Sequence, residues 1–261
     1  MDIAGKIIVV TGGGGGIGEG LCRRFAAEGA KTVVVADLDE ERARKVAESI
    51  KGIAAYCDVR DRRDIEDLIS NTEERVGPID LFCSNAGIIT LGGVEVPDEQ
   101  WQRIWEINVL SHVRVGRVLI PRMIERGGGA LMITASAAGL LSQIGSIPYS
   151  VTKHAAVGLA ESIAITYGDQ GIQVFALCPQ AVRSDMTRRH EGGGVAAVDG
   201  LMEPEEVAEK VMQAFRDDTF LILPHGEVKT YMQRKASDYD RWLHGMRRLQ
   251  ARFLEGAPLK Q

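Results

Sequence analysis

The sequence predicts a doubly wound α/β fold, a parallel sheet with helices on both faces. Short apolar runs alternate with longer helical patterns along the 261-residue chain, an order typical of successive βα units. The runs at residues 6–11, 32–36 and 79–84 are mostly apolar and do not alternate with polar residues as a half-exposed strand would, which is typical of strands covered by two helical layers. In such sheets ligands bind at the carboxyl ends of the strands, so we expect the functional residues there.

Each strand and helix is predicted by its own pattern. The strands are short apolar runs bounded by polar residues or glycine. After the three already named, strands are predicted at residues 53–57, 130–134, 173–177 and 220–223. The helices repeat apolar residues every three or four positions. They begin near Ile17 and are then predicted at residues 40–50, 60–76, 98–126, 149–167 and 203–215.

Glycine and proline mark the ends of several elements. Gly77-Pro78 ends the third helix, and the glycines at residues 127–129 end the fourth before the next strand. Pro121 lies inside that fourth helix. We expect it to kink or split the helix, because proline lacks the backbone donor that the helix needs.

Two segments depart from this alternation. Residues 180–200 mix charge with glycine and carry no period, which predicts a mobile flap. Residues 227–261 are basic and carry a helical apolar stripe, formed by Trp242, Met246, Leu249 and Phe253. We expect a single domain over residues 1–261, with a core at 1–226 and a helical C-terminal extension at 227–261. The stripe should pack on the chain's own core or meet a neighbouring subunit.

Composition favours a cytoplasmic protein with a small-molecule partner. The net charge of −5 gives no electrostatic reason to expect nucleic acid or a membrane surface. No apolar run approaches the ~20 residues of a membrane helix, and the first residues lack the pattern of a signal peptide. The four cysteines are scattered, without a CxxC pair, as is typical of a reducing compartment. The five histidines lack metal-ligand spacing, so we expect no metal.

The glycine turn, residues 12–18, joins the first strand to the first helix. Glycine lets the backbone turn tightly and leaves no Cβ in the way of a ligand. The helix start behind it offers unpaired N–H groups. Gly12, Gly16, Ile17 and Gly18 are therefore predicted to seat a pyrophosphate. A tight turn without a ligand is the alternative, which glycines alone leave open.

Acidic residues end the next two strands. Asp37 lies nineteen residues after Gly18, near the ~20 expected of an acid that binds the adenosine ribose. A carboxylate there repels the 2′-phosphate of NADP, and the turn holds no Arg or Lys that could bind this phosphate. Both observations favour NAD over NADP. The alternative for Asp37 is a helix cap. Asp58, followed by Val59, is predicted to accept a hydrogen bond from adenine or to cap a helix starting at Arg60.

Small residues follow the fourth strand. Asn85, Ala86 and Gly87 let the backbone pass close to a ribose. The Asn85 amide can equally bridge neighbouring strands. The sequence does not separate these two interpretations.

A tyrosine and a lysine share one helix face. Tyr149 and Lys153 are four residues apart, so they lie on the same side of a helix. A lysine ammonium beside the phenol is expected to lower its pKa, which makes Tyr149 a general acid/base near neutral pH. Ser136 ends the preceding strand and is placed to donate a hydrogen bond to a carbonyl oxygen. Asn108 sits in mid-helix, where an amide has no local use.

Taken together, these motifs resemble those of the short-chain dehydrogenase/reductase family, in its single-domain Rossmann-fold form. The matching elements are Thr11-Gly12-x-x-x-Gly16-Ile17-Gly18, then Ser84-Asn85-Ala86-Gly87 with serine in the first place, and Asn108, Ser136, Tyr149 and Lys153. The resemblance covers residues 6–184, and the combination of motifs is highly specific.

The resemblance implies a role for each of these residues. Tyr149 passes a proton to or from the substrate oxygen. Lys153 lowers the pKa of the tyrosine and binds the nicotinamide ribose. Ser136 polarises the carbonyl, and Asn108 holds a water for a proton relay. A hydride then moves between the substrate carbon and NAD(H), with NADP the less favoured cofactor.

One segment departs from the family pattern. The family has Pro-Gly after the sixth strand, then a threonine that touches the nicotinamide carboxamide. This chain reads Cys178-Pro179-Gln180-Ala181-Val182-Arg183-Ser184. By the resemblance, Pro179, Val182 and Ser184 contact the cofactor. Gln180 replaces the glycine and is expected to project its amide into the substrate pocket.

The substrate is expected to be a hydrophobic secondary alcohol or ketone. Its pocket should be formed by Ser136, Gln143, Tyr149 and Gln180 together with the flap. The loop at residues 137–147 is mostly apolar, which favours an apolar substrate. The resemblance also implies a homodimer or homotetramer, built through the helices around Asn108 and Tyr149.

Two other functions compete with this interpretation. One is a catalytically silent NAD(H)-binding sensor or scaffold on the same fold. Against it, a binding module has no use for a Tyr–Lys pair beside a serine. The other is an epimerase or dehydratase, but those usually carry a longer C-terminal substrate domain than this chain offers.

Overall fold

The protein is built around one parallel sheet of seven strands. The computed structural model describes residues 1–189 and 191–254. The strand order is β3-β2-β1-β4-β5-β6-β7, so the chain starts in the middle and builds outward to each edge in turn. The strands are β1 (Ile7–Thr11), β2 (Thr32–Asp37), β3 (Ile53–Tyr56), β4 (Leu81–Ser84), β5 (Gly129–Thr134), β6 (Ile172–Leu177) and β7 (Leu221–Ile222). The predicted doubly wound fold is confirmed, and the order reverses between β1 and β4.

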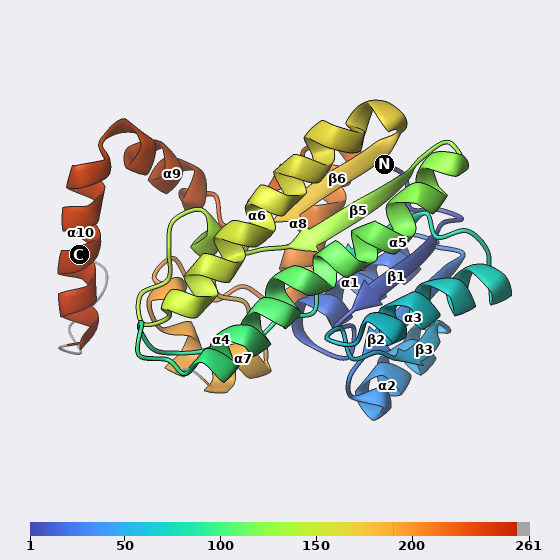
Figure 1. Cartoon of the computed structure of the whole chain (residues 1–261), viewed down its shortest axis with the longest axis horizontal. Helices are drawn as coiled ribbons and strands as arrows, with labels where there is room; N and C mark the ends of the chain where they lie inside the picture. The colour runs from blue at the N-terminus through green and yellow to red at the C-terminus, as the bar shows by residue number, and fades with distance from the viewer. Residues whose placement is uncertain (190, 255–261) are drawn as a thin grey trace.

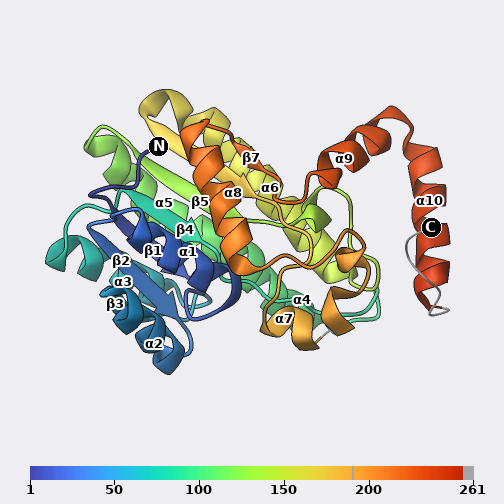
Figure 2. The same ribbon diagram turned by 180° about the vertical axis from the view of Figure 1, so that it is seen from behind.

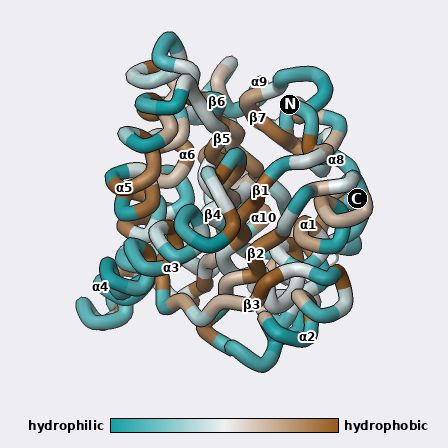
Figure 3. The backbone as a smooth tube through the Cα atoms, turned by 90° about the vertical axis from the view of Figure 1, so that its right-hand side faces the viewer, coloured by the Kyte–Doolittle hydropathy of each residue, from teal (hydrophilic) through white to brown (hydrophobic). Residues whose placement is uncertain are grey.

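Helices cover both faces of the sheet. Figure 1 looks onto α3 (Arg62–Arg75), α5 (Ser111–Glu125) and α6 (Ile147–Tyr167). Figure 2, from behind, shows α1 (Gly16–Ala27), α2 (Glu40–Ile50) and α8 (Pro204–Arg216). Each layer buries its own apolar cluster against the sheet, and Figure 3 shows hydrophobic colour concentrated on the strands. The inner strands are therefore apolar on both faces, as predicted, whereas the edge strand β3 exposes Ile53 and Tyr56.

The long helix expected at residues 98–126 is interrupted elsewhere than predicted. The structure has α4 (Asp98–Trp105), a π-helical turn η1 (Glu106–Leu110) and then α5. Pro121 lies inside α5, which continues beyond it to Glu125, so the split predicted at Pro121 is wrong. The interruption centres on Asn108, whose side chain bonds to the backbone of Ile88. Single π-helical turns inside α-helices are frequently found at functional sites.

The predicted flap is not irregular throughout. It contains the short helix α7 (Asp185–Arg189) and the 3-10 helix η4 (Glu191–Ala197). The backbone N–H of Thr187 donates to the Ser184 hydroxyl at 3.3 Å, and the Thr187 hydroxyl donates to the carbonyl of Val182 at 3.0 Å. These local bonds hold the start of α7 without any apolar period in the sequence.

The C-terminal extension forms two helices. They are α9 (Glu227–Ser237) and α10 (Tyr239–Leu254), and α10 stands to one side of the sheet (Figure 1). Residues 255–261 of the expected extension lie outside the described residues. Within the described part of the chain, no helix has the length and apolar character required to cross a membrane.

The glycine turn is packed closely against the end of β4. A Cβ on Gly18 would lie 2.0 Å from the Gly12 carbonyl oxygen and 2.8 Å from Asn85 Nδ2. No side chain fits at such distances without moving the backbone of the turn. Gly226, which precedes α9, offers a contrast, since its φ is −62° and a Cβ there would meet nothing within 4 Å.

Gly18→Ala is expected to destabilise the protein by about 1–3 kcal/mol, because the added methyl overpacks the turn. Gly226→Ala should be neutral or stabilising by at most about 1 kcal/mol, since it only restricts the unfolded chain. Urea unfolding of the two variants beside the parent measures both effects. Equal midpoints for the two variants would contradict the packing described.

Candidate active site

The glycine turn forms a cradle between β1 and α1. Gly12 and Gly16 have φ of +64° and +52°, which favours glycine at both positions. The N-cap of α1, Gly15, has no side chain to bond the first helical N–H groups. Those groups are therefore available to an anion, with the helix dipole behind them. The cradle fits the pyrophosphate of a dinucleotide.

Asp37 ties the end of β2 to this cradle. Its Oδ2 accepts from the Gly14 N–H at 2.9 Å, and its Oδ1 accepts from the Asp39 N–H at 3.0 Å. The cap of α2 is Asp39, which accepts from the Arg42 N–H. The helix-cap interpretation of Asp37 is therefore wrong, and its carboxylate lies beside the glycine turn.

A cation that sequence reasoning missed lies near the same turn. Arg42 Nη1 is 3.9 Å from where a Cβ on Gly15 would be, and Arg42 forms ion pairs with Asp39 and Asp185. The turn itself contains no Arg or Lys, as stated above. Arg42 reaches it from α2, twenty-four residues after Gly18, and no spacing in the sequence signals this approach.

Asp58 is engaged by its neighbour Arg60. The Asp58 carboxylate accepts from the Arg60 backbone N–H at 2.9 Å and pairs with its guanidinium at 2.6 Å. This hydrogen bond with the Arg60 side chain holds the pKa of Asp58 below its usual value. The cap of α3 is Asp61, so the capping role considered for Asp58 is wrong. Val59 is buried, and its carbonyl accepts from Arg114 at 3.3 Å.

Asn85 bridges the ends of two strands. Its Nδ2 donates to the Thr11 carbonyl at 3.0 Å, and its backbone N–H donates to the Thr11 hydroxyl at 3.0 Å. Of the two interpretations left open, the bridging amide is the one that the geometry shows. Ala86 packs under the turn, since a Cβ on Gly12 would lie 3.0 Å from its Cα.

Gly87 brings this segment against two polar side chains. A Cβ on Gly87 would be 3.4 Å from both Asn108 Oδ1 and Lys153 Nζ. Asn108 is fully buried, with Oδ1 accepting from the Ile88 N–H at 2.9 Å and Nδ2 donating to Thr152 Oγ1 at 3.2 Å. The four predicted catalytic residues come from three segments of the chain: Asn108 from η1, Ser136 from the loop after β5, and Tyr149 and Lys153 from α6.

Lys153 is a buried cation on α6. Its side chain is held by a hydrogen bond from Nζ to the Thr134 carbonyl at 2.9 Å, and the residue is 3% exposed. Burial lowers the pKa of its ammonium group from 10.5 to about 8. Lys153 Nζ lies 5.6 Å from the centroid of the Tyr149 ring.

The expected effect of Lys153 on Tyr149 is wrong in this structure. The pKa of Tyr149 is raised, because burial penalises the phenolate more than a hydrogen bond with Ser136 favours it. The lysine lies over the ring and donates to Thr134, so its charge is not directed at the phenol oxygen. Ser136 itself follows β5, and its Oγ accepts from the Ala138 N–H at 3.1 Å.

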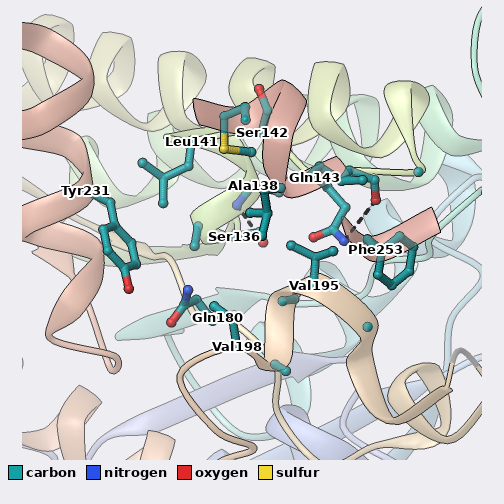
Figure 4. Close-up of a pocket in the computed structure, with 18 of the residues that line it drawn as sticks. Ser136, Ala138, Leu141, Ser142, Gln143, Gln180, Val195, Val198, Tyr231 and Phe253 are labelled. Carbon is teal, nitrogen blue, oxygen red and sulfur yellow. Dashed lines mark hydrogen bonds between the residues drawn. The ribbon is translucent and has the colours of Figure 1, made fainter. Parts of the chain in front are cut away.

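A cavity of about 1110 Å³ opens above these residues. All four predicted substrate residues line it: Ser136, Gln143, Tyr149 and Gln180. Figure 4 shows apolar Leu141, Val195 and Val198 around Ser136 and Gln180. The cavity is large enough for a substrate of drug-like size, and it receives side chains from the flap as predicted.

Gln180 is anchored within the cavity wall by residues that the sequence did not indicate. Its Nε2 donates to Asp199 Oδ2 at 3.2 Å, and its backbone N–H donates to His225 Nδ1 at 3.2 Å. Tyr231 donates to the same aspartate at 3.1 Å. The network joins three segments distant in sequence, so no motif spacing could have revealed it.

The chain beyond Gln180 returns to the glycine turn. Pro179 accepts the Ala137 N–H at 2.9 Å, and Val182 pairs with Met202 in an isolated bridge. Ser184 packs on the turn, since a Cβ added at Gly16 would lie 3.1 Å from the Cβ of Ser184. Ser184 therefore lies against the cradle, and Pro179 lies against Ala137 of the cavity wall.

The C-terminal stripe forms one wall of the cavity. Trp242 packs with Leu141 and Val228, so this residue packs on the chain's own core, which was one of the two alternatives. Met246, Leu249 and Phe253 line the cavity. The sequence analysis had considered only packing on the core or contact with a neighbouring subunit, and not a role in the cavity wall. The helix α10 therefore contributes to the candidate substrate site.

A buried histidine lies beneath the site. His112 Nδ1 is 2.6 Å from the Ser84 hydroxyl, the serine that replaces an asparagine of the family motif. Burial, reinforced by the charge of Lys153, lowers the pKa of His112 to about 3, so the ring is neutral at pH 7. Sequence reasoning had assigned His112 no role.

Known proteins share both the sequence motifs and the fold of this chain. The family model described as short chain dehydrogenase matches residues 6–192. A meso-2,3-butanediol dehydrogenase of Serratia marcescens is 33% identical, with 85% of this chain and 92% of that protein covered. A 1-deoxy-11-beta-hydroxypentalenate dehydrogenase of Streptomyces exfoliatus is 32% identical, with 94% and 91% covered.

Solved structures agree with the fold described. A short chain dehydrogenase/reductase from Burkholderia phymatum, solved in complex with NAD, has a TM-score of 0.85 at 24% identity. The match covers 92% of this chain and 96% of that one. At this identity the likeness shows the arrangement of strands and helices.

Lys153→Met is expected to stabilise the protein by about 1–3 kcal/mol at pH 7, because it removes a buried charge. Below pH 8 the lysine is protonated in both states, so the full penalty of burying it applies. As pH rises from about 8 towards 10.5, the folded state releases its proton first and the penalty falls. Urea unfolding at pH 7 and pH 10 should show the gain shrinking with pH. A gain that is absent, or that grows with pH, contradicts this assignment.

Proposed function

The chain belongs to the short-chain dehydrogenase/reductase family, and we propose that it transfers a hydride between NAD(H) and a hydrophobic secondary alcohol or ketone. One observation carries the proposal: Tyr149 and Ser136 line the same cavity, and buried Lys153 lies 5.6 Å from the tyrosine ring centroid. Two relatives are named as dehydrogenases of alcohol substrates, a butanediol and a hydroxypentalenate, which supports oxidation at a CH–OH carbon.

The family binds a nicotinamide cofactor, and the cradle fits one. When bound, this cofactor accepts or supplies the hydride. In our proposal Gly12, Gly16, Ile17 and Gly18 hold its pyrophosphate. The adenosine half lies against Asp37, Asp58 and Val59, and the nicotinamide half contacts Asn85, Ala86, Gly87, Pro179, Val182 and Ser184.

The chain's own residues handle the proton and the substrate. In the reduction direction the Tyr149 phenol, kept protonated by its raised pKa, donates its proton to the substrate carbonyl oxygen as the hydride arrives. In the oxidation direction the deprotonated phenol accepts the hydroxyl proton from that substrate oxygen as the carbinol hydrogen leaves as hydride. Ser136 donates a hydrogen bond to the same oxygen. Lys153, whose side chain is held by the Thr134 carbonyl, binds the nicotinamide ribose. Asn108 Oδ1 accepts one hydrogen bond from Ile88, so its second lone pair can hold a relay water.

The large cavity and its apolar lining support a hydrophobic substrate. Gln143 and Gln180 supply polar groups to the wall, and Gln180 takes the place of the family's glycine. In the proposal these two amides orient the substrate. A silent NAD(H)-binding sensor or scaffold is not favoured, because the cavity reaches the proposed catalytic residues and the relatives are named as enzymes.

Location and assembly complete the proposal. We assign the protein to the cytoplasm, which the four free, buried cysteines support. We also propose a homodimer or homotetramer through the helices around Asn108 and Tyr149. Apolar side chains exposed on α6, with Ile165 at 84% and Val151 at 43%, support contact there.

Tyr149→Phe is expected to lower kcat by about 10²–10⁴-fold, because the proton acceptor is lost. NADH binding should be unchanged, since the phenol is not needed to seat the cofactor. Reduction of NAD with a panel of secondary alcohols, followed near 340 nm, measures the rate, and fluorescence titration measures NADH binding. Tyr167→Phe, a tyrosine at the other end of α6, is the matched control and should keep full activity. A fully active Tyr149→Phe enzyme would remove Tyr149 from the mechanism.

Asp37→Ser is expected to raise kcat/KM for NADP by at least about tenfold relative to NAD, because it removes the charge that repels a 2′-phosphate. Arg42, beside the turn, should then pair with that phosphate, so adding Arg42→Ala should cancel the gain. The control Asp39→Ser removes an equal charge from the neighbouring helix cap. Wild-type enzyme that already prefers NADP would contradict the NAD assignment.

A further inference from the structure

We propose that the substrate is an anionic amphiphile, whose acidic group is bound by three arginines of the C-terminal helices: Arg234, Arg241 and Arg248. The inference rests on the proposed function, which assigns the hydroxyl or carbonyl group that reacts. It adds the chemical class of the rest of the substrate molecule. An apolar body occupies the cavity, and an anion such as a carboxylate marks its far end.

The three arginines belong to the wall of the cavity. Arg234 comes from α9, and Arg241 and Arg248 from α10, and all three line the same space as Ser136 and Tyr149. Arg241 and Arg248 are seven residues apart, which places them on one side of α10, two turns from each other. The helix therefore presents a line of guanidinium groups to the cavity.

An apolar stripe runs beside this line on α10. Trp242, Met246, Leu249 and Phe253 follow one another at spacings of three or four, and each lines the cavity. Leu141 and Val195 provide apolar surface from the loop and the flap. One helix thus offers apolar contact and positive charge side by side, which matches a ligand with a hydrocarbon body and an anionic end.

These three arginines, like Arg247 on α10, have no side-chain partner among the described residues. Within residues 1–189 and 191–254, none of the three has a side-chain ion pair or hydrogen bond. By contrast, Arg183 pairs with Glu203 at 2.7 Å. The lining includes a single acid among its described residues, Asp238, whose Oδ1 already accepts the Arg241 N–H at 2.9 Å.

The positive charge of the three arginines changes the electrostatic potential inside the cavity. Unpaired guanidinium groups facing a low-dielectric wall concentrate positive potential inside the cavity. A planar guanidinium binds a carboxylate through two parallel hydrogen bonds, which gives both attraction and orientation. The anion would then hold the substrate with its other end directed to Tyr149 and Ser136.

Binding of decanoate tests the anion site without any turnover. Calorimetry should show that decanoate binds the wild-type protein and that 1-decanol, with the same chain but no charge, binds at least about tenfold more weakly. The double variant Arg241→Gln, Arg248→Gln should bind decanoate about tenfold more weakly than wild type. Arg247→Gln removes the same charge from α10 at a residue outside the lining, and it should bind as wild type does.

Turnover of a matched pair of alcohols tests the link to catalysis. 9-Hydroxydecanoate and its methyl ester carry the same secondary alcohol and differ in charge. Wild-type enzyme should oxidise the acid with kcat/KM at least about tenfold above that of the ester, mainly through KM. In the double arginine variant this ratio should fall towards one, because KM for the acid rises while KM for the ester does not.

The outcomes separate this inference from the proposed function. Oxidation of acid and ester at equal rates would overturn the anion site and leave the dehydrogenase proposal standing. Arginine-dependent binding of decanoate, with no oxidation of any alcohol, would support the anion site and count against the dehydrogenase. A double variant that binds decanoate normally but changes oligomeric mass would overturn the proposal, because the arginines would then serve a subunit contact.

Discussion

The close packing of the glycine turn on the segment after β4 is the constraint on which the rest of the site depends. Asn85 holds the end of β1 through Thr11, and its amide leaves room at Gly18 for glycine alone. Two residues later Gly87 lies against Asn108 and Lys153. A single short segment therefore fixes the cofactor cradle relative to the proposed catalytic side chains.

Local pattern was enough to predict the doubly wound sheet and the residues at its strand ends. Asp37 ends β2, Ser136 follows β5, and Tyr149 and Lys153 share one helix face, so the strand and helix patterns place them near the carboxyl ends of the strands. Their catalytic roles were implied only by the combination of motifs and its resemblance to the family. The interruption at Asn108 was not predictable, because it depends on hydrogen bonds to Ile88, twenty residues away. The same holds for Arg42 and for α10, whose positions are set by tertiary contacts that leave no spacing in the sequence.

Electrostatics separates the two halves of the site. On the proposed catalytic side, burial lowers the pKa of Lys153 and of His112 and raises that of Tyr149, so all three pKa values depart from their ordinary values. Such arrangements reduce stability and are typical of active sites. On the substrate side, three arginines line the cavity, and none of them has a side-chain partner within residues 1–189 and 191–254. In our account, substrate supplies the missing negative charge.

The central claim is that a hydride passes between an alcohol carbon bound beside Tyr149 and a nicotinamide cofactor. Transfer of label tests it most directly. The protein would be incubated with NAD and 9-hydroxydecanoate deuterated at the carbinol carbon, and the reduced cofactor analysed by mass spectrometry. The account predicts reduced cofactor carrying one deuterium, formed by wild-type protein and not by Tyr149→Phe. Reduced cofactor without label, or labelled equally by both proteins, would contradict it.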